Sequence, residues 1–237
     1  MQITPLYDAP DFLRFGGVLD DPVGVNRFWA MSIAAGRDGE PTRVLAAFDP
    51  VATPAAMVEG VRSLTSATVL AHFVESNEAI AESVAGLDEG GWSMLGEAPP
   101  GHIPLRAVAL HALWDAWIHE RDIALPLGFA PLEADDEIAA CLRYAAVLSP
   151  AFAISQGSTR PGSIVVEATH PDVRVVVDVS DTILVHDGAA AHEALHLTGP
   201  AVALLEALSY RAPMPDPVGD GPMWLLHGLA EVFDREP

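Results

Sequence analysis

The chain has 237 residues, and its 12 basic residues against 33 acidic ones give a formal net charge of −21. All 12 basic residues are arginines, which excludes enzymes that need a lysine amine, such as Schiff-base enzymes and phosphate-binding-loop NTPases. The acidity disfavours nucleic acid and membrane surfaces as partners, the single cysteine Cys141 excludes an internal disulfide, and we expect a cytoplasmic protein.

Apolar residues recur at three- and four-residue spacing through the first two thirds of the chain, which predicts helices. Thr53 followed by Pro54 is typical of a helix start, with Thr53 as the N-cap. Residues 95–101 contain Pro-Pro-Gly and are expected to form a loop, and residues 1–22 fit no clear element. The predicted helices cover residues 28–35, a segment starting at 53, and residues 66–87, 104–125 and 133–148.

Beyond residue 158 the apolar period changes to two, and short β-branched runs alternate with tight turns. This pattern predicts an antiparallel meander followed by two helices. The predicted strands cover residues 164–168, 173–179, 182–185 and 194–198, and the predicted helices cover residues 200–210 and 222–233. The fold class is therefore α+β, with a helical domain over residues 1–157 and a small α/β domain over residues 158–237.

The predicted helix over residues 104–125 carries four polar side chains on one stripe, because His111, Asp115, His119 and Asp122 follow at steps of four, four and three. Asp115 and His119 are one turn apart, and such a pair can grip one divalent ion. A third ligand has to come from another element. His72, on the preceding predicted helix, is the best-placed candidate.

The same stripe is also compatible with the solvated face of a helix, stabilised by weak side-chain pairs. Against that, Trp114 and Trp117 interleave with the stripe, so that much of the helix circumference is apolar and the helix is expected to be buried. A buried His–Asp pair needs partners or a metal ion.

Three arginines, Arg106, Arg121 and Arg211, are the natural anion-binding candidates in so acidic a chain, with Arg121 expected to pair with Asp122 or a neighbouring helix. Cys141 is interpreted as a small buried hydrophobic residue.

The pattern Asp115-x-x-x-His119-x-x-Asp122 and its surroundings, residues 106–128, resemble the acidic-x-x-x-His-x-x-Asp helix of the mycothiol-dependent maleylpyruvate isomerase family, which is related to DinB-like metal-binding bundles. The resemblance extends to Asn26-Arg-Phe-Trp29 and residues 48–50, and to residues 201–211 and 228–234, which resemble the family's C-terminal α/β domain.

This resemblance implies a DinB-like helical bundle that holds one divalent metal ion, with zinc expected, through Asp115, His119 and a further histidine. It also implies mycothiol as co-substrate, bound to the metal as a thiolate, and an isomerase or S-transferase acting on a small electrophilic substrate. Arg211 lies where such isomerases place an arginine that contacts substrate or thiol, and a bidentate grip on a carboxylate is the physical reason for an arginine there.

One feature departs from the family: its further histidine precedes the segment at Asn26, whereas no histidine precedes His72 here. Either the N-terminus is shortened or diverged, or His72 substitutes, or the metal site is incomplete. The missing histidine favours a non-catalytic protein, whereas the stripe from His111 to Asp122 favours an enzyme, and we expect a metal- and thiol-dependent enzyme. The alternative is a non-catalytic metal- or thiol-binding or regulatory protein of the same fold, and a third reading makes the C-terminal domain a small apolar-ligand module.

Overall fold

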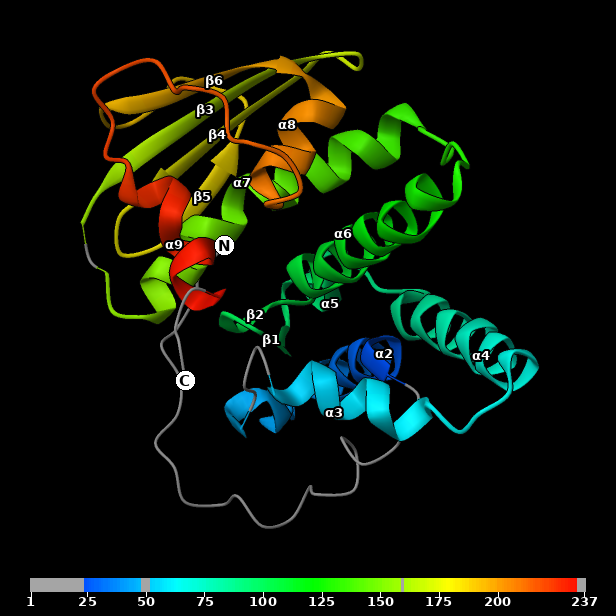
Figure 1. Cartoon of the computed structure of the whole chain (residues 1–237). Helices are drawn as coiled ribbons and strands as arrows, with labels where there is room; N and C mark the ends of the chain where they lie inside the picture. Colours follow the sequence, from blue (N-terminus) through cyan, green and yellow to red (C-terminus); the bar gives the residue numbers. More distant parts are fainter. Residues whose placement is uncertain (1–23, 48–51, 159, 234–237) are drawn as a thin grey trace. The chain divides into compact units, whose positions relative to one another are not determined.

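The computed structural model describes residues 24–47, 52–158 and 160–233 (Figure 1). Residues 1–22, for which no element is predicted, residues 48–50 of the resemblance and the side chain of Thr53 lie outside this description. The chain packs into two compact units, and the division falls inside helix α6, Leu105–Ala124, between residues 109 and 110. The boundary at residues 157 and 158 marks a change of sequence pattern and stays a prediction.

The unit of residues 24–109 is mainly helical, and in it α2 packs against α4 and against β1. Helix α4 begins at the residue that the sequence predicts, because Thr65 Oγ1 accepts a hydrogen bond from the Thr68 amide at 3.2 Å and caps the first turn. The elements are α2 Gly24–Arg37, η1 Val44–Ala47, α3 Ala52–Val61, α4 Ser66–Val84, α5 Glu89–Ser93, β1 Leu95–Ala98 and β2 Gly101–Pro104.

The loop predicted over residues 95–101 is wrong, because these residues belong to an antiparallel hairpin of β1 and β2 that turns at Pro99 and Pro100. Glu97 in β1 is fully buried and holds this hairpin to the first turn of η1. Its carboxylate accepts hydrogen bonds from the amides of Val44 and Leu45 at 2.7 and 2.8 Å. Strand β1 has the sequence Leu-Gly-Glu-Ala and β2 the sequence Gly-His-Ile-Pro, so neither contains the β-branched run that marks a strand in the sequence.

The unit of residues 110–233 combines the remainder of α6 with a four-stranded sheet in the order β5-β4-β3-β6. Helix α7 packs against β4 and β5, and α8 and α9 pack against α7 (Figure 1). The mixed α+β class is confirmed, whereas the DinB-like arrangement of the helices stays a prediction. The elements are η2 Leu125–Leu127, α7 Asp135–Ser155, β3 Gly162–Thr169, β4 Val173–Val179, β5 Ile183–His186, β6 Ala194–Pro200, α8 Ala201–Leu208 and α9 Trp224–Phe233.

The predicted meander is correct for β3, β4 and β5, which pair antiparallel, and wrong for β6. Strand β6 runs parallel to β3, with Ile164 opposite Leu195. The connection over residues 187–193 makes this crossover possible, and hydrogen bonds to Asp178 of β4 hold the connection in place. One oxygen of the Asp178 carboxylate accepts from the Ala191 amide at 3.0 Å and the other lies 2.7 Å from His186 Nε2.

Helix α7 is predicted to end at residue 148, but it continues through Pro150 to Ser155. Proline removes one backbone donor, and packing compensates, since thirteen side chains of α7 are buried. Helix α9 crosses α7 so closely that a Cβ at Gly228 would lie 2.0 Å from the Ser149 carbonyl oxygen. By length and composition α7 is apolar enough to cross a membrane, but 67% of that apolar window is buried inside the structure, as in a core helix.

Candidate functional site

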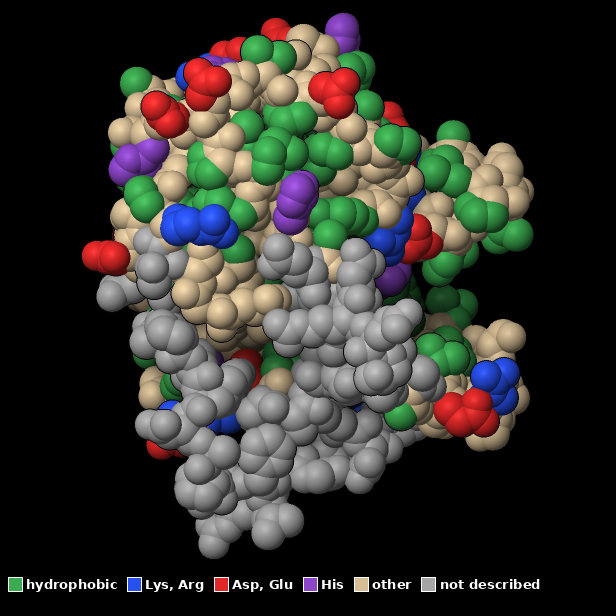
Figure 2. Space-filling model, turned by 60° about the vertical axis from the view of Figure 1, so that its left-hand side comes forward, with side chains coloured by type: hydrophobic (Ala, Val, Ile, Leu, Met, Phe, Trp, Pro, Cys, Tyr) green, Lys and Arg blue, Asp and Glu red, His purple; other side chains and the backbone are tan. Residues whose placement is uncertain are grey.

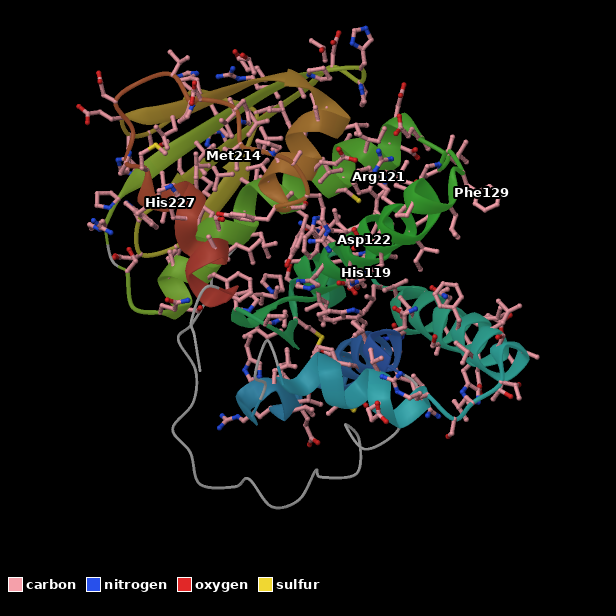
Figure 3. The ribbon with its side chains drawn as sticks, viewed as in Figure 1. His119, Arg121, Asp122, Phe129, Met214 and His227 are labelled. Atoms are coloured by element: carbon pink, nitrogen blue, oxygen red, sulfur yellow. The ribbon has the colours of Figure 1, made fainter. Side chains whose placement is uncertain are left out.

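Helix α6 brings the last three residues of the predicted stripe, Asp115, His119 and Asp122, together. The two ring nitrogens of His119 face two carboxylates: Nε2 lies 3.5 Å from Asp115 Oδ1, and Nδ1 lies 3.4 Å from Asp122 Oδ2. The His119 side chain is 60% exposed and that of Asp115 is 20% exposed, so the stripe is open to solvent at His119. Figure 3 labels His119 and Asp122 on this helix.

Arg211 joins this stripe from a position about ninety residues further along the chain. Its Nε and Nη2 donate to the two oxygens of Asp122 at 2.9 and 2.8 Å, which makes a bidentate ion pair. Its Nη1 donates to the Ser209 carbonyl at 3.3 Å. The arginine is therefore held against the last turn of α6 from both sides.

The end of α8 explains how Arg211 reaches this place. Tyr210 adopts a left-handed backbone conformation with φ of 57°. The Tyr210 amide donates to Ala207 O at 3.0 Å, and the Arg211 amide donates to Glu206 O at 2.8 Å. These two bonds form a Schellman motif, in which a non-glycine residue occupies the position that glycine usually takes. The Tyr210 hydroxyl donates to Leu226 O at 2.5 Å and holds the turn to α9.

The electrostatics of the stripe follow from these contacts. The hydrogen bond with Asp115 raises the pKa of His119 above its usual value, and burial opposes this rise. The hydrogen bond from Arg211 lowers the pKa of Asp122. Asp122 is thus kept ionised beside His119. The charges of Asp115 and Asp122 also raise the pKa of His119, and the charge of Arg211 opposes them.

A buried aromatic cluster supports the stripe from beneath. His111 is 5% exposed, and its Nδ1 forms a short hydrogen bond with the Tyr144 hydroxyl from α7. Burial lowers the pKa of His111 to about 4, so it is a neutral part of the core. Trp114 packs against both rings and donates from Nε1 to Ser209 Oγ at 2.8 Å. The first residue of the predicted stripe is therefore structural.

A cavity of about 270 Å³ lies beside the stripe, within the same unit, and Asp122 and Arg211 form part of its wall. Arg121 also lines it but is already neutralised, because it pairs with Glu133 and Glu206 at 2.8 Å each and stacks on Trp117 at 4.6 Å. The expected pairing of Arg121 with Asp122 is wrong, and the expected pairing with a neighbouring helix is confirmed.

The predicted metal ligands divide between the two units. Asp115 and His119 lie in the unit of residues 110–233, whereas His72 lies half-buried on α4 in the unit of residues 24–109. Within residues 24–47, 52–158 and 160–233, no three His, Cys, Asp or Glu side chains gather as a ligand set for a metal ion. His72 as third ligand stays a prediction.

Sequence reasoning missed the residues that hold the stripe in place, namely Tyr144, Ser209 and Tyr210. Tyr144 lies 33 residues along the chain from its partner His111, and Ser209 lies 95 residues from its partner Trp114. No local spacing connects such distant positions. Arg106, the remaining arginine candidate, pairs with Glu89 at 2.8 Å on the exposed surface of the other unit.

The fold is similar to that of two solved structures. The mycothiol-dependent maleylpyruvate isomerase superposes with a TM-score of 0.51 and 16% sequence identity, over 85% of this chain and 76% of that one. A histidine-to-alanine mutant of a mycothiol-dependent maleylpyruvate isomerase gives a TM-score of 0.51 and 17% identity, over 84% and 79% of the two chains. No family model matches the sequence, and no curated protein matches it. The likeness is one of fold.

Proposed function

We propose that the chain is a metal- and mycothiol-dependent enzyme of the maleylpyruvate isomerase type, an isomerase or S-transferase acting on a small electrophilic substrate. The observation that carries this proposal is the placement of His119 between two carboxylates, one at each ring nitrogen. The fold it shares with a mycothiol-dependent isomerase supports the same conclusion.

The geometry of Asp115 and His119 fits two ligands of one zinc ion. Zinc binds oxygen and nitrogen at about 2.0–2.1 Å in a tetrahedron, so that neighbouring ligand atoms are about 3.3 Å apart. Asp115 Oδ1 and His119 Nε2 are 3.5 Å apart. Histidines that bind zinc commonly donate their other ring N–H to a carboxylate, and Asp122 lies 3.4 Å from Nδ1. We propose Asp115, His119 and His72 as the metal ligands.

A bound zinc ion would lower the pKa of a bound thiol, so that the thiolate nucleophile exists at neutral pH. Asp122 holds the His119 ring in the orientation that directs Nε2 towards Asp115, and Arg211 holds Asp122. Within the described part of the chain, the Arg211 guanidinium donates two hydrogen bonds to Asp122 and one to the Ser209 carbonyl, which uses three of its five N–H donors. The others can bind a substrate carboxylate in the adjacent cavity, and this is the role that we propose for Arg211.

The alternative is a non-catalytic metal- or thiol-binding or regulatory protein of the same fold. Two observations favour it: no third ligand joins Asp115 and His119 within the described part of the chain, and Arg211 already binds a carboxylate of its own chain. Metal binding without turnover would support this alternative.

The metal content of zinc-loaded and desalted protein, measured by inductively coupled plasma mass spectrometry, tests the proposal. We expect about one zinc per chain, lost in His119→Ala and Asp115→Ala and lowered in His72→Ala. Exchange of Asp122 for Asn should weaken zinc binding about 10- to 100-fold, because the carboxylate that orients the His119 ring is lost. The exposed His192 supplies a matched control, and His192→Ala should bind zinc like the parent.

Mycothiol-dependent isomerisation of maleylpyruvate, followed by ultraviolet absorbance on the zinc-loaded protein, then separates the two functions. Turnover that requires both zinc and mycothiol supports the enzyme. Zinc bound equally by the parent and by His119→Ala would refute the proposed centre.

A further inference from the structure

A second cavity lies in the unit of residues 110–233, between α9 and the proline-rich segment that leads from Tyr210 to α9. Its volume is about 280 Å³, and it shares no lining residue with the cavity beside the α6 stripe. Figure 3 labels Met214 of the proline-rich segment and His227 of α9, two of the residues that line it. None of its lining residues takes part in the proposed metal site.

The proline-rich segment is held at both ends. At its start, the Tyr210 hydroxyl bonds to Leu226 O at 2.5 Å. Near its end, the amides and carbonyls of Val218 and His196 exchange two hydrogen bonds of 2.7 and 3.0 Å, so that the segment adds a bridge to the edge of β6. Gly221 approaches β6 so closely that a Cβ there would lie 2.3 Å from Leu195 N. The cavity is thus formed without a ligand, which reduces the entropy cost of binding.

The lining is mainly apolar, and its polar members, Asp216, His227 and Tyr210, are exposed to solvent. Two methionines, Met214 and Met223, contribute flexible thioethers, which favour contact with aromatic rings. Asp216 is the acidic group of the lining, and neither lysine nor arginine contributes to it. In Figure 2, which brings this side forward, hydrophobic side chains gather in the upper part, the sheet-bearing unit, with acidic side chains towards its margin.

Size and charge together define the ligand. A closed apolar cavity of about 150 Å³ holds a benzene molecule. The cavity at α9 measures about 280 Å³ and is open to solvent at Asp216, Met223 and His227, so that one ring with a short side chain fits with the side chain towards the opening. Asp216 and the net charge of −21 favour a cation over an anion. We propose that this cavity binds a small aromatic amine, with its ring against Met214 and Met223 and its ammonium group at Asp216.

Calorimetric titration of the full chain with phenethylamine tests this proposal, with 3-phenylpropionate as an anion of similar shape. We expect phenethylamine to bind with a dissociation constant on the order of 1 mM, as befits a ligand of this size, and the anion to bind at least several-fold more weakly. Equal binding of the two probes, or binding of neither, would overturn the proposal.

Two variants locate the site. Ala230→Met fills the cavity from α9 with a good helix former and should abolish binding. Asp216→Asn keeps the shape and should weaken phenethylamine about two- to five-fold, a loss that high salt in the parent reproduces. Asp220, an exposed carboxylate of the same segment outside the lining, supplies the matched control, and Asp220→Asn should bind like the parent.

Circular dichroism checks that Ala230→Met folds. If this variant does not fold, the binding measured for Asp216→Asn tests the proposal in its place. Undiminished binding in both variants would place the ligand elsewhere and refute the assignment. His119→Ala should bind phenethylamine normally, so that the outcome for this cavity is independent of that for the metal centre.

Discussion

Replacement of His111 by Gln should make the folded chain less sensitive to acid. The pKa of His111 is lowered by burial to about 4 in the fold, whereas an exposed histidine in the unfolded chain has a pKa near 6.5. Above the unfolded value both states are neutral, and the histidine has no effect. As the pH falls below 6.5 the unfolded state takes up the proton first, so that stability is lost until the folded pKa is reached.

The magnitude follows from these two pKa values. The histidine has a pKa of 6.5 in the unfolded chain and about 4 in the fold, so at pH 5 mainly the unfolded chain is protonated. This lowers the free energy of unfolding by about 2 kcal/mol at pH 5 and by almost nothing at pH 7. Glutamine retains an amide beside the Tyr144 hydroxyl but cannot titrate. The parent should therefore lose about 2 kcal/mol more than His111→Gln between pH 7 and pH 5.

Urea denaturation at pH 7, 6 and 5, followed by circular dichroism, measures this difference. The exposed His192 gives the control, and His192→Gln should follow the parent. The three proteins contain the same carboxylates, so the comparison isolates the exchange at position 111. Nuclear magnetic resonance of the imidazole protons gives a second readout, in which the His111 signals stay constant down to about pH 5. Parallel loss of stability in parent and His111→Gln would refute the reasoning.

Three further changes probe other parts of the same unit. Arg121→Ala should cost about 2 kcal/mol in urea unfolding, since it leaves the Glu206 carboxylate unpaired beside an apolar wall; a cost below about 0.5 kcal/mol would show that the pair is no better than a surface one. Cys141 should resist iodoacetamide at pH 8 in the folded chain and react in urea, because burial raises the pKa of its thiol to about 12; equal rates would contradict this. Asp178→Asn should destabilise the fold by about 2 kcal/mol, because charge-assisted hydrogen bonds are lost. It should also speed hydrogen exchange at the Ala191 amide, which donates to Asp178. Unchanged exchange would mean that another contact holds the 187–193 connection.

Hydrophobic period alone located most of the elements. Helix α6 spans Leu105–Ala124 where the sequence predicts residues 104–125, and β4 occupies the predicted residues 173–179. Period is a local property, because each residue's face depends only on the steps to its neighbours. For the same reason the sequence placed Asp115, His119 and Asp122 on one side of α6.

Elements whose form depends on distant partners were not readable in this way. The parallel pairing of β6 with β3 and the passage of α7 through Pro150 depend on packing between segments far apart in the chain. A strand pattern carries no direction of pairing, and a proline is tolerated in a helix only when surrounding contacts compensate for the lost hydrogen bond.

The sequence by itself therefore determined the composition class, most helices and strands, and the paired carboxylate and histidine on α6. The tertiary structure decided that His111 is a neutral core residue bound to Tyr144 and that Asp122 is held by Arg211. It also created the cavity at Asp216, whose lining comes from two separate segments. Spacing along a helix is set by covalent geometry, whereas burial and the choice of ion-pair partner exist only once distant segments pack together.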